Sequence, residues 1–289
     1  MDPNDRMGGV PHCLKGKLCG HACIAPTIQT DNQSGAVQRM LTYRPGGDLL
    51  QDNHVGGTLF GYIYNAAKRL VEVTQNGTAE GEYAYDFQGQ RVLRWILGSA
   101  YTAYIHDEQG HLLAEHNGHT GAVSVEYTWI DDMPVEQESA GATWFIHTGQ
   151  IGEVQMVTNG NGTAALWSAY VDPYGTATNI GTPSITMNMR LPGQYYQDET
   201  NSLSQNRYRD YDPSLGRYVE ADPVGVKAGQ NVYAYVDGDP LNVWDPKGLR
   251  PITPADWGMI GGADAGIEIA GLGPEDPFAD LAAALADIA

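Results

Sequence analysis

One unit of a repeating pattern reads Tyr83-Ala84-Tyr85-Asp86-Phe87-Gln88-Gly89-Gln90-Arg91-Val92-Leu93-Arg94-Trp95-Ile96. Side chains alternate between the two faces of a strand, so Tyr83 and Tyr85 are expected on the same face. Asp86 then begins a turn through its side-chain oxygen, and Gly89 supplies a backbone position with positive φ. The apolar run after the turn predicts a return strand. The unit is therefore expected to be a β-hairpin.

The same pattern recurs at a constant interval. It is seen at Tyr62-Ile63-Tyr64-Asn65 and again at Tyr104-Ile105-His106-Asp107. Asn65, Asp86 and Asp107 follow one another at intervals of 21 residues. A fixed period of about 20 residues is typical of stacked supersecondary units, none of which buries its apolar face alone.

Looser versions of the pattern continue further along the chain. Residues 127–135 and 170–175 each join a strand-like run to turn-forming residues, and residues 144–162 read as one more hairpin. We expect residues 36–249 to be all-β, an almost wholly antiparallel, curled sheet of hairpins. An ordinary β-sandwich or a propeller is the alternative that this patterning leaves open.

The composition of the 289-residue chain fits this expectation and narrows the function. Glycine (36) and tyrosine (17) are abundant and phenylalanine (4) is scarce, which suits turns and half-exposed pleated faces. The formal net charge of −19 argues against nucleic-acid binding and against docking on an anionic membrane. No apolar run predicts a transmembrane helix, and the first residues lack a secretory signal pattern. We expect secretion without a signal peptide, or residence in the cytoplasm before export.

Residues 1–35 show no periodicity and are expected to form an irregular leader, with a truncated earlier repeat as the alternative. Cys13, Cys19 and Cys23 lie there, interleaved with His12 and His21. Their spacing is not a common zinc-ribbon pattern, and an odd number of cysteines argues against a closed disulfide framework. We therefore expect neither a metal site nor a cofactor.

A second set of motifs fills residues 190–249. In order, it runs Arg190-Leu191-Pro192-Gly193-Gln194-Tyr195-Tyr196, Asn206-Arg207-Tyr208-Arg209-Asp210-Tyr211-Asp212-Pro213, Gly216-Arg217-Tyr218-Val219, Asp222-Pro223-Val224-Gly225 and Asn231-Val232-Tyr233-Ala234-Tyr235, and it ends at Asp245-Pro246-Lys247-Gly248-Leu249. Together with the hairpin repeat, this set resembles the YD repeats and RHS-repeat-associated core domain of RHS and teneurin-type proteins. The resemblance covers roughly residues 36–249. It departs at Asp237-Gly238-Asp239-Pro240, where the family usually has Asn-Asn-Pro.

The resemblance implies a β-shell around a toxin, at the C-terminal end of a polymorphic toxin or of a Tc-toxin C-type chain. Many members of this family cut their own backbone after the last Leu of the final motif. By motif position, the two aspartates of such a protease fall on Asp222 and Asp245. The cut then falls between Leu249 and Arg250.

Two carboxyl groups within reach of one water molecule suit peptide hydrolysis. Like charges that are close do not both ionise readily, so the pair shares one proton. The ionised group takes a proton from water, while the other protonates the scissile carbonyl or donates a hydrogen bond to it. The resemblance also implies an assisting arginine upstream of the cut. By spacing it falls on Arg209, with Arg207 as second choice, and the two share a face if their segment is a strand. Asp-Pro pairs also begin ordinary turns, so a purely structural role for these aspartates stays open.

The sequence thus divides into an irregular leader (1–35), a YD-repeat shell (36–189), the core domain (190–249) and a variable tail (250–289). The tail is acidic and glycine-rich, and an amphipathic helix is expected after Asp276-Pro277. It is too short for most enzymes, so no activity is expected of it.

The main hypothesis is a carrier shell whose core domain cuts itself once, as an aspartyl-type protease. The alternative is a non-cleaving structural or adhesive YD-repeat fragment with lost or truncated cargo. A small toxin or membrane-active peptide in the tail is a weaker third, because anionic, glycine-rich segments bind membranes poorly. The implied partners are the rest of the shell, the chain's own C-terminal segment as cargo, and secretion-apparatus and immunity proteins.

Overall fold

The computed structural model describes residues 28–30, 37–225, 230–249 and 251–252. Most of them form one antiparallel sheet of 15 strands, in which every strand pairs with its neighbours in the sequence. The strands are β1 (Ile28–Thr30), β2 (Val37–Tyr43), β3 (Leu49–His54), β4 (Leu59–Tyr64), β5 (Leu70–Gln75), β6 (Thr78–Tyr85), β7 (Arg91–Ile96), β8 (Thr102–His106), β9 (Leu112–Asn117), β10 (Val123–Ile130), β11 (Met133–Ser139), β12 (Ala142–Thr148), β13 (Val154–Asn159), β14 (Ala165–Val171) and β15 (Ala177–Asn179).

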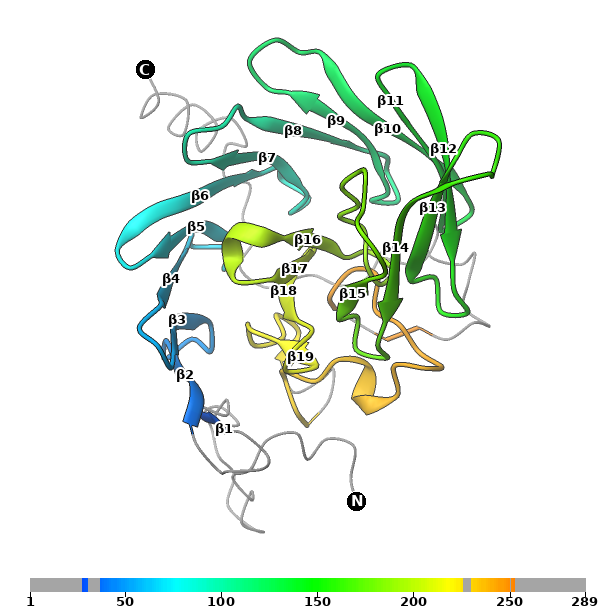
Figure 1. Ribbon diagram of the computed structural model, residues 1–289. Helices are drawn as coiled ribbons and strands as arrows, with labels where there is room; N and C mark the ends of the chain where they lie inside the picture. Colours follow the sequence, from blue (N-terminus) through cyan, green and yellow to red (C-terminus); the bar gives the residue numbers. More distant parts are fainter. Residues whose placement is uncertain (1–27, 31–36, 226–229, 250, 253–289) are drawn as a thin grey trace.

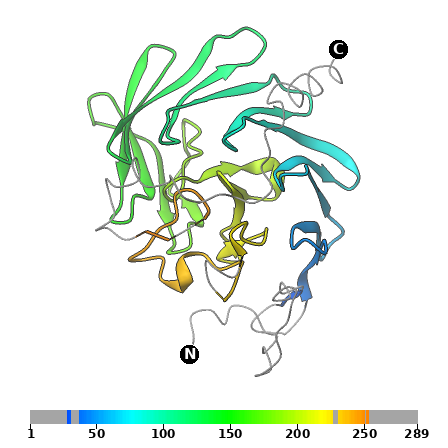
Figure 2. The same ribbon diagram turned by 180° about the vertical axis from the view of Figure 1, so that it is seen from behind.

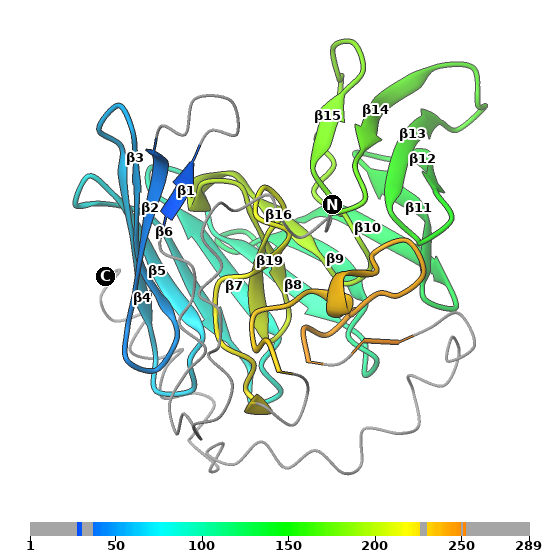
Figure 3. The ribbon, with the colours of Figure 1, turned by 90° about the horizontal axis from the view of Figure 1, so that it is seen from below.

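This continuous row of hairpins confirms the curled antiparallel sheet and excludes the separate blades of a propeller. The sheet is open, because β1 and β15 stand at its two ends and do not pair with each other. Figures 1 and 3 show it curving around the segment that follows it in the sequence. The described residues contain no α-helix, and none of their helical turns is long and apolar enough to cross a membrane.

The repeat turns use the chemistry that the sequence predicts. Asp86 Oδ1 accepts a hydrogen bond from the backbone N–H of Gln90 (2.8 Å), and Gly89 has a φ of 74°. Asn65 accepts the equivalent bond in the preceding unit, where Lys68 takes the positive φ (60°). The Asp or Asn oxygen is therefore the common feature of the turn, and glycine at the third position is replaceable.

A second, four-stranded sheet lies inside the curl of the first (Figures 1 and 2). Its strands are β16 (Tyr195–Gln197), β17 (Leu203–Asn206), β18 (Arg209–Asp212) and β19 (Arg217–Tyr218), and the 3₁₀ segments η1 (Asp198–Thr200) and η3 (Val236–Gly238) accompany it. Tyr62 of β4 donates to the carbonyl of Thr200 (3.1 Å), and Arg94 of β7 binds Glu199 (2.8 Å). These contacts fix the small sheet to the concave face of the large one.

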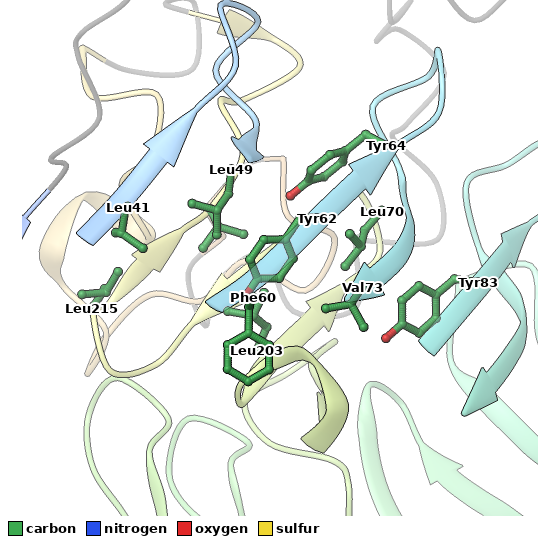
Figure 4. Packing of buried hydrophobic residues seen from close by; sticks show 11 residues of the cluster. Leu41, Leu49, Phe60, Tyr62, Tyr64, Leu70, Val73, Tyr83, Leu203 and Leu215 are labelled. Carbon is green, nitrogen blue, oxygen red and sulfur yellow. The ribbon is translucent and has the colours of Figure 1, made fainter. Parts of the chain in front are cut away.

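Apolar side chains fill the space between the two sheets, as Figure 4 shows. Tyr62, Val73 and Leu203 are at most 1% exposed. The first two come from the large sheet and the third from the small one, so each sheet completes the core of the other. The cluster consists of Leu41, Leu49, Phe60, Tyr62, Tyr64, Leu70, Val73, Tyr83, Leu203, Leu215 and Val219.

The sheet begins within the segment that the sequence assigns to the leader. Residues 28–30 are not irregular but form β1, in which Ile28 faces Met40 and Gln29 faces Arg39 of β2. Three residues are too few to show a hydrophobic period, so the pattern could not reveal this strand. The cysteines at 13, 19 and 23, Arg250 and the helix expected in the tail lie outside the described residues.

Candidate functional site

Arg209, Asp222 and Asp245 come from three separate segments and lie close together. All three side chains are buried. Arg209 is the first residue of β18, where it pairs with Asn206 of β17 across a two-residue turn. Asp222 lies beyond β19, and its backbone N–H donates to the carbonyl of Val232 (2.9 Å). Asp245 lies close to the end of the second motif set. Short β-pairings between segments that are far apart in the sequence therefore assemble the site.

The guanidinium of Arg209 contacts both carboxyl groups. Its Nη2 lies 3.1 Å from Asp222 Oδ2 and 3.4 Å from Asp245 Oδ2. The separation of these two oxygens cannot exceed the sum of the two distances, so the two carboxyl groups lie close to each other. The guanidinium also covers the ring of Tyr218, 3.6 Å from its centroid, and its Nε donates to the carbonyl of Gly248 (2.6 Å). Arg209 thus binds the two acids and the chain that leads into the expected cut.

Asp245 accepts hydrogen bonds from three sides. Its Oδ2 accepts from Tyr218 Oη (3.0 Å) and from Arg209 Nη2, and its Oδ1 accepts from the backbone N–H of Leu249 (3.0 Å). All three partners are donors, which is the pattern that an ionised carboxylate satisfies. The last bond places Leu249 directly beside one of the two acids.

The segment that carries Asp245 and Leu249 is a closed loop. Trp244 and Ile252 pair as an antiparallel bridge, with N···O distances of 3.1 and 2.8 Å. Inside the loop Gly248 has a φ of 68°, and a Cβ there would lie 2.5 Å from the carbonyl oxygen of Asn206. Only glycine fits at this position. Both sides of the expected cut are therefore held against the core.

Asp222 has a different environment from Asp245. Its Oδ1 accepts a hydrogen bond from the backbone N–H of Val224 (2.7 Å), so it does begin a turn as an ordinary Asp-Pro pair would. Burial raises the pKa of Asp222, the charge of Asp245 raises it further, and Arg209 opposes both. This environment favours the protonated form of Asp222.

A small cavity lies where these groups meet. Its volume is about 20 Å³, and its wall includes Arg209, Asp222, Asp245, Leu249 and Pro251. A single water molecule needs about 10–15 Å³ by this measure and two or more polar partners. The cavity therefore has the size and the lining for one water molecule, in contact with both acids and with the residue before the expected cut.

Arg207 does not belong to this group. It has a φ of 47° and lies in the turn between β17 and β18, so the condition under which it would share a face with Arg209, a continuous strand, is not met. Its guanidinium lies against the ring of Tyr208, 5.2 Å from the centroid, and lines a different, larger cavity. Alternation of side chains fails here because the segment is a hairpin turn and not one continuous strand.

The sequence did not single out Asn206 and Tyr218, which are both fully buried in the site. Asn206 Nδ2 donates to the Asp245 carbonyl (2.7 Å) and to Tyr218 Oη (2.9 Å), which in turn donates to the Asp245 carboxylate. Tyrosine occurs in nearly every motif of this chain, so nothing separated Tyr218 from tyrosines that only pack. Asn206 could have been noticed as a polar side chain within a strand that pairs on both sides.

Fold and motif order together define an open shell of YD hairpins that curls around a core segment. The family model of the teneurin YD-shell matches residues 60–236. This match spans more than half of the chain, and the chain belongs to the YD-shell family.

Two curated relatives are toxins by name. Double-stranded DNA deaminase toxin A of Burkholderia cenocepacia (strain H111) is 31% identical over 242 residues, which cover 72% of this chain and 16% of that protein. Toxin protein Tse5 of Pseudomonas aeruginosa is 25% identical over 241 residues, which cover 70% of this chain and 18% of that protein. The chain therefore spans less than a fifth of the length of either relative.

Solved structures show the same fold. The crystal structure of TcdB2-TccC3-Cdc42 has a TM-score of 0.52 and 17% sequence identity to this chain. The matched region covers 79% of this chain and 14% of the solved one. At this identity the similarity bears on the fold alone.

Proposed function

We propose that this chain is the C-terminal part of an RHS toxin shell whose core domain (190–249) cuts its own Leu249–Arg250 bond. The reaction is a single turnover of an aspartyl-type protease, and it frees the segment from residue 250 onward as cargo. The observation that carries this proposal is the water-sized cavity lined by Asp222, Asp245 and Leu249.

The environments of the two acids suggest their roles. Asp245, surrounded by donors, is the base that takes a proton from the water molecule as its oxygen attacks the carbonyl carbon of Leu249. Asp222, whose pKa is raised by burial, gives its proton to the carbonyl oxygen. When the C–N bond breaks, the nitrogen of Arg250 takes the proton from Asp245, and a hydroxyl proton of the intermediate returns to Asp222. The products are a carboxyl group at Leu249 and a free amine at Arg250.

Arg209 has a positioning role in this reaction. Its contacts to both acids keep them apart at a fixed separation, and its bond to the Gly248 carbonyl holds the peptide one residue before the cut. Leu249 is itself bound through its N–H to Asp245 (3.0 Å). Fixed geometry of this kind lowers the entropic part of the barrier.

A shell function implies partner proteins. The relatives named above are toxins several times longer than this chain, so we infer that the rest of the shell is contributed by further YD hairpins. The two unpaired ends of the open sheet, β1 and β15, are where such hairpins would continue it. We further infer delivery outside the producing cell without a signal peptide, a secretion apparatus that carries the shell, and an immunity protein against its cargo.

The test compares Asp222→Asn with a matched control. Asparagine can neither share a proton with Asp245 nor donate one to the carbonyl oxygen, and each such role is worth about 10²–10⁴ in rate. Asp172→Asn is the control, since Asp172 also precedes a proline and begins a turn, by binding the N–H of Tyr174 (2.9 Å). We expect wild type and Asp172→Asn to be cut and Asp222→Asn to stay whole on a denaturing gel. Cutting that survives Asp222→Asn contradicts catalysis by this aspartate, an uncut wild type favours the non-cleaving structural fragment, and a cut between Asp245 and Pro246 indicates acid lability.

A further inference from the structure

A second, larger cavity lies between strands of the shell and the core segment. Its volume is about 100 Å³, which is several times the space that one water molecule needs, about 10–15 Å³. Gln90, His111 and Trp129 line it from the shell side, and Gln194 and Arg207 line it from the core side. The proposed cleavage reaction makes no use of this cavity.

Polar atoms without partners gather in its wall. Gln90 Nε2, Arg207 Nε and both polar atoms of the Gln194 side chain have no hydrogen-bond partner among the described residues. Gln90 and Gln194 are only 4% and 3% exposed, so bulk solvent does not satisfy them. Buried polar groups in native proteins are nearly always bonded, to protein, to water or to a ligand. These atoms therefore indicate an occupant.

Two of the donors converge on one point. A Cβ placed on Gly110, whose φ is 100°, would lie 2.8 Å from Gln90 Nε2 and 3.0 Å from Arg207 Nη1. The two nitrogens therefore lie beside Gly110, no further apart than the sum of these two distances, and both can reach oxygens of one bound group. Both groups are donors only at these atoms, so whatever binds to the two together must accept hydrogen bonds.

The charged side chains that line the cavity also favour a group that accepts hydrogen bonds and carries negative charge. Arg91, Arg190, Arg207 and Lys247 all line it, within a chain whose net charge is −19. Burial together with the charges of Arg207 and Arg91 lowers the pKa of His106, another lining residue, to about 4. Burial is the largest of these causes, Asp107 opposes it, and the two arginines add to it.

The acidic groups nearby already have partners. Asp132, the acid in the wall, binds His111 Nε2 (2.8 Å), and His111 Nδ1 binds Asp107 (2.8 Å). Arg91 lies 3.8 Å from Asp210 outside the cavity wall. Arg207, by contrast, forms no ion pair with a described residue, and its contact to the Tyr208 ring does not neutralise its charge.

We propose that this cavity binds a small oxyanion, a phosphate or a carboxylate group, with Gln90 and Arg207 as its principal donors. Water alone fits the lining less well, because water brings donors as well as acceptors and the unpartnered atoms are mostly donors. An oxyanion brings only acceptors, and bonds from a guanidinium to it are the strong, charge-assisted kind. The stacked rings of His111 and Trp129, with centroids 4.6 Å apart, form a flat wall for the remainder of an organic anion.

The experiment measures the melting temperature of the full chain against increasing inorganic phosphate and, separately, acetate, at an ionic strength held constant with sodium chloride. Binding to the folded state raises the melting temperature saturably. Arg207→Gln should weaken the apparent affinity about tenfold or more, because it removes a charge-assisted bond. Gln90→Glu puts a carboxylate beside Arg207 and should abolish the dependence on the added anion.

Arg44→Gln is the matched control. Arg44 covers the ring of Tyr64 at 5.5 Å much as Arg207 covers that of Tyr208, but it does not line the cavity. It should keep the wild-type response. A response to phosphate alone identifies a phosphate site and a response to acetate alone a carboxylate site. The proposal is overturned if neither anion gives a saturable rise, or if Arg207→Gln or Gln90→Glu responds as the wild type does, and the cavity then holds water only.

Discussion

Replacing Arg209 by glutamine should destabilise the folded chain strongly. The variant loses the contacts to Asp222 (3.1 Å) and Asp245 (3.4 Å) and the bond to the Gly248 carbonyl (2.6 Å), and it leaves two buried acids facing each other. Removing one partner of a buried ion pair costs about 3–5 kcal/mol. At roughly 2–4 °C per kcal/mol for a chain of this size, the melting temperature should fall by about 6–20 °C.

The loss should depend on pH in a definite direction. Arg209 is the group that opposes the upward shift of the Asp222 pKa by burial and by Asp245, so its removal raises that pKa further. The unfolded pKa of an aspartate is about 3.9. When the folded pKa is higher, the folded protein becomes less stable as pH rises from the unfolded pKa through the folded pKa. The difference between variant and wild type should therefore be largest at neutral pH and smaller near pH 4.

Thermal unfolding followed by circular dichroism at about pH 4.5 and about pH 7.5 measures both effects. The double variant Arg209→Gln/Asp222→Asn should recover part of the loss, because it removes one of the two unpaired charges. A loss below about 1 kcal/mol at neutral pH would refute the reasoning, since that is the range of exposed pairs. A loss of equal size at both pH values, without recovery in the double variant, would show that packing and not charge explains it.

Three further results are expected. Leu203→Ala, at a fully buried position between the two sheets, should cost about 2–5 kcal/mol in denaturant unfolding, against about 0.5 kcal/mol or less for Leu241→Ala, where the side chain is 58% exposed. Burial raises the pKa of Glu220 well above its usual value, so stability should fall as pH rises above the unfolded pKa, and Glu220→Gln should flatten the dependence of unfolding free energy on pH. After cutting, both pieces should elute together in size exclusion and separate in denaturant, because Ile252 is buried and bridged to Trp244; separation without denaturant would contradict this.

The hairpin sheet was predictable because its signals are local. Asp86 and Asp107 begin their turns through their own side-chain oxygens, and the alternation of tyrosines fixes which face is buried. Such features repeat in successive units, so each copy strengthens the prediction of a hairpin for the others. The proximity of Asp222 and Asp245 was different, since it came from resemblance to a family and not from any pattern within the chain.

The features that the sequence did not reveal depend on tertiary contacts or on very short segments. The positive φ of Arg207 turns the chain between two four-residue strands, and strand alternation cannot show that. Strand β1 is three residues long and exists by pairing with β2. The convergence of Gln90 and Arg207 beside Gly110 joins positions far apart in the sequence, which only the curl of the sheet brings together.

The intact mass of freshly purified protein tests the central claim most directly. The account predicts two masses, those of residues 1–249 and 250–289, with a hydrolytic cut that adds one water molecule across the Leu249–Arg250 bond. The same preparation of Asp222→Asn should give the single mass of the whole chain. A wild-type sample that remains one uncut species of 31.2 kDa would contradict self-cleavage and leave the shell as a structural carrier alone.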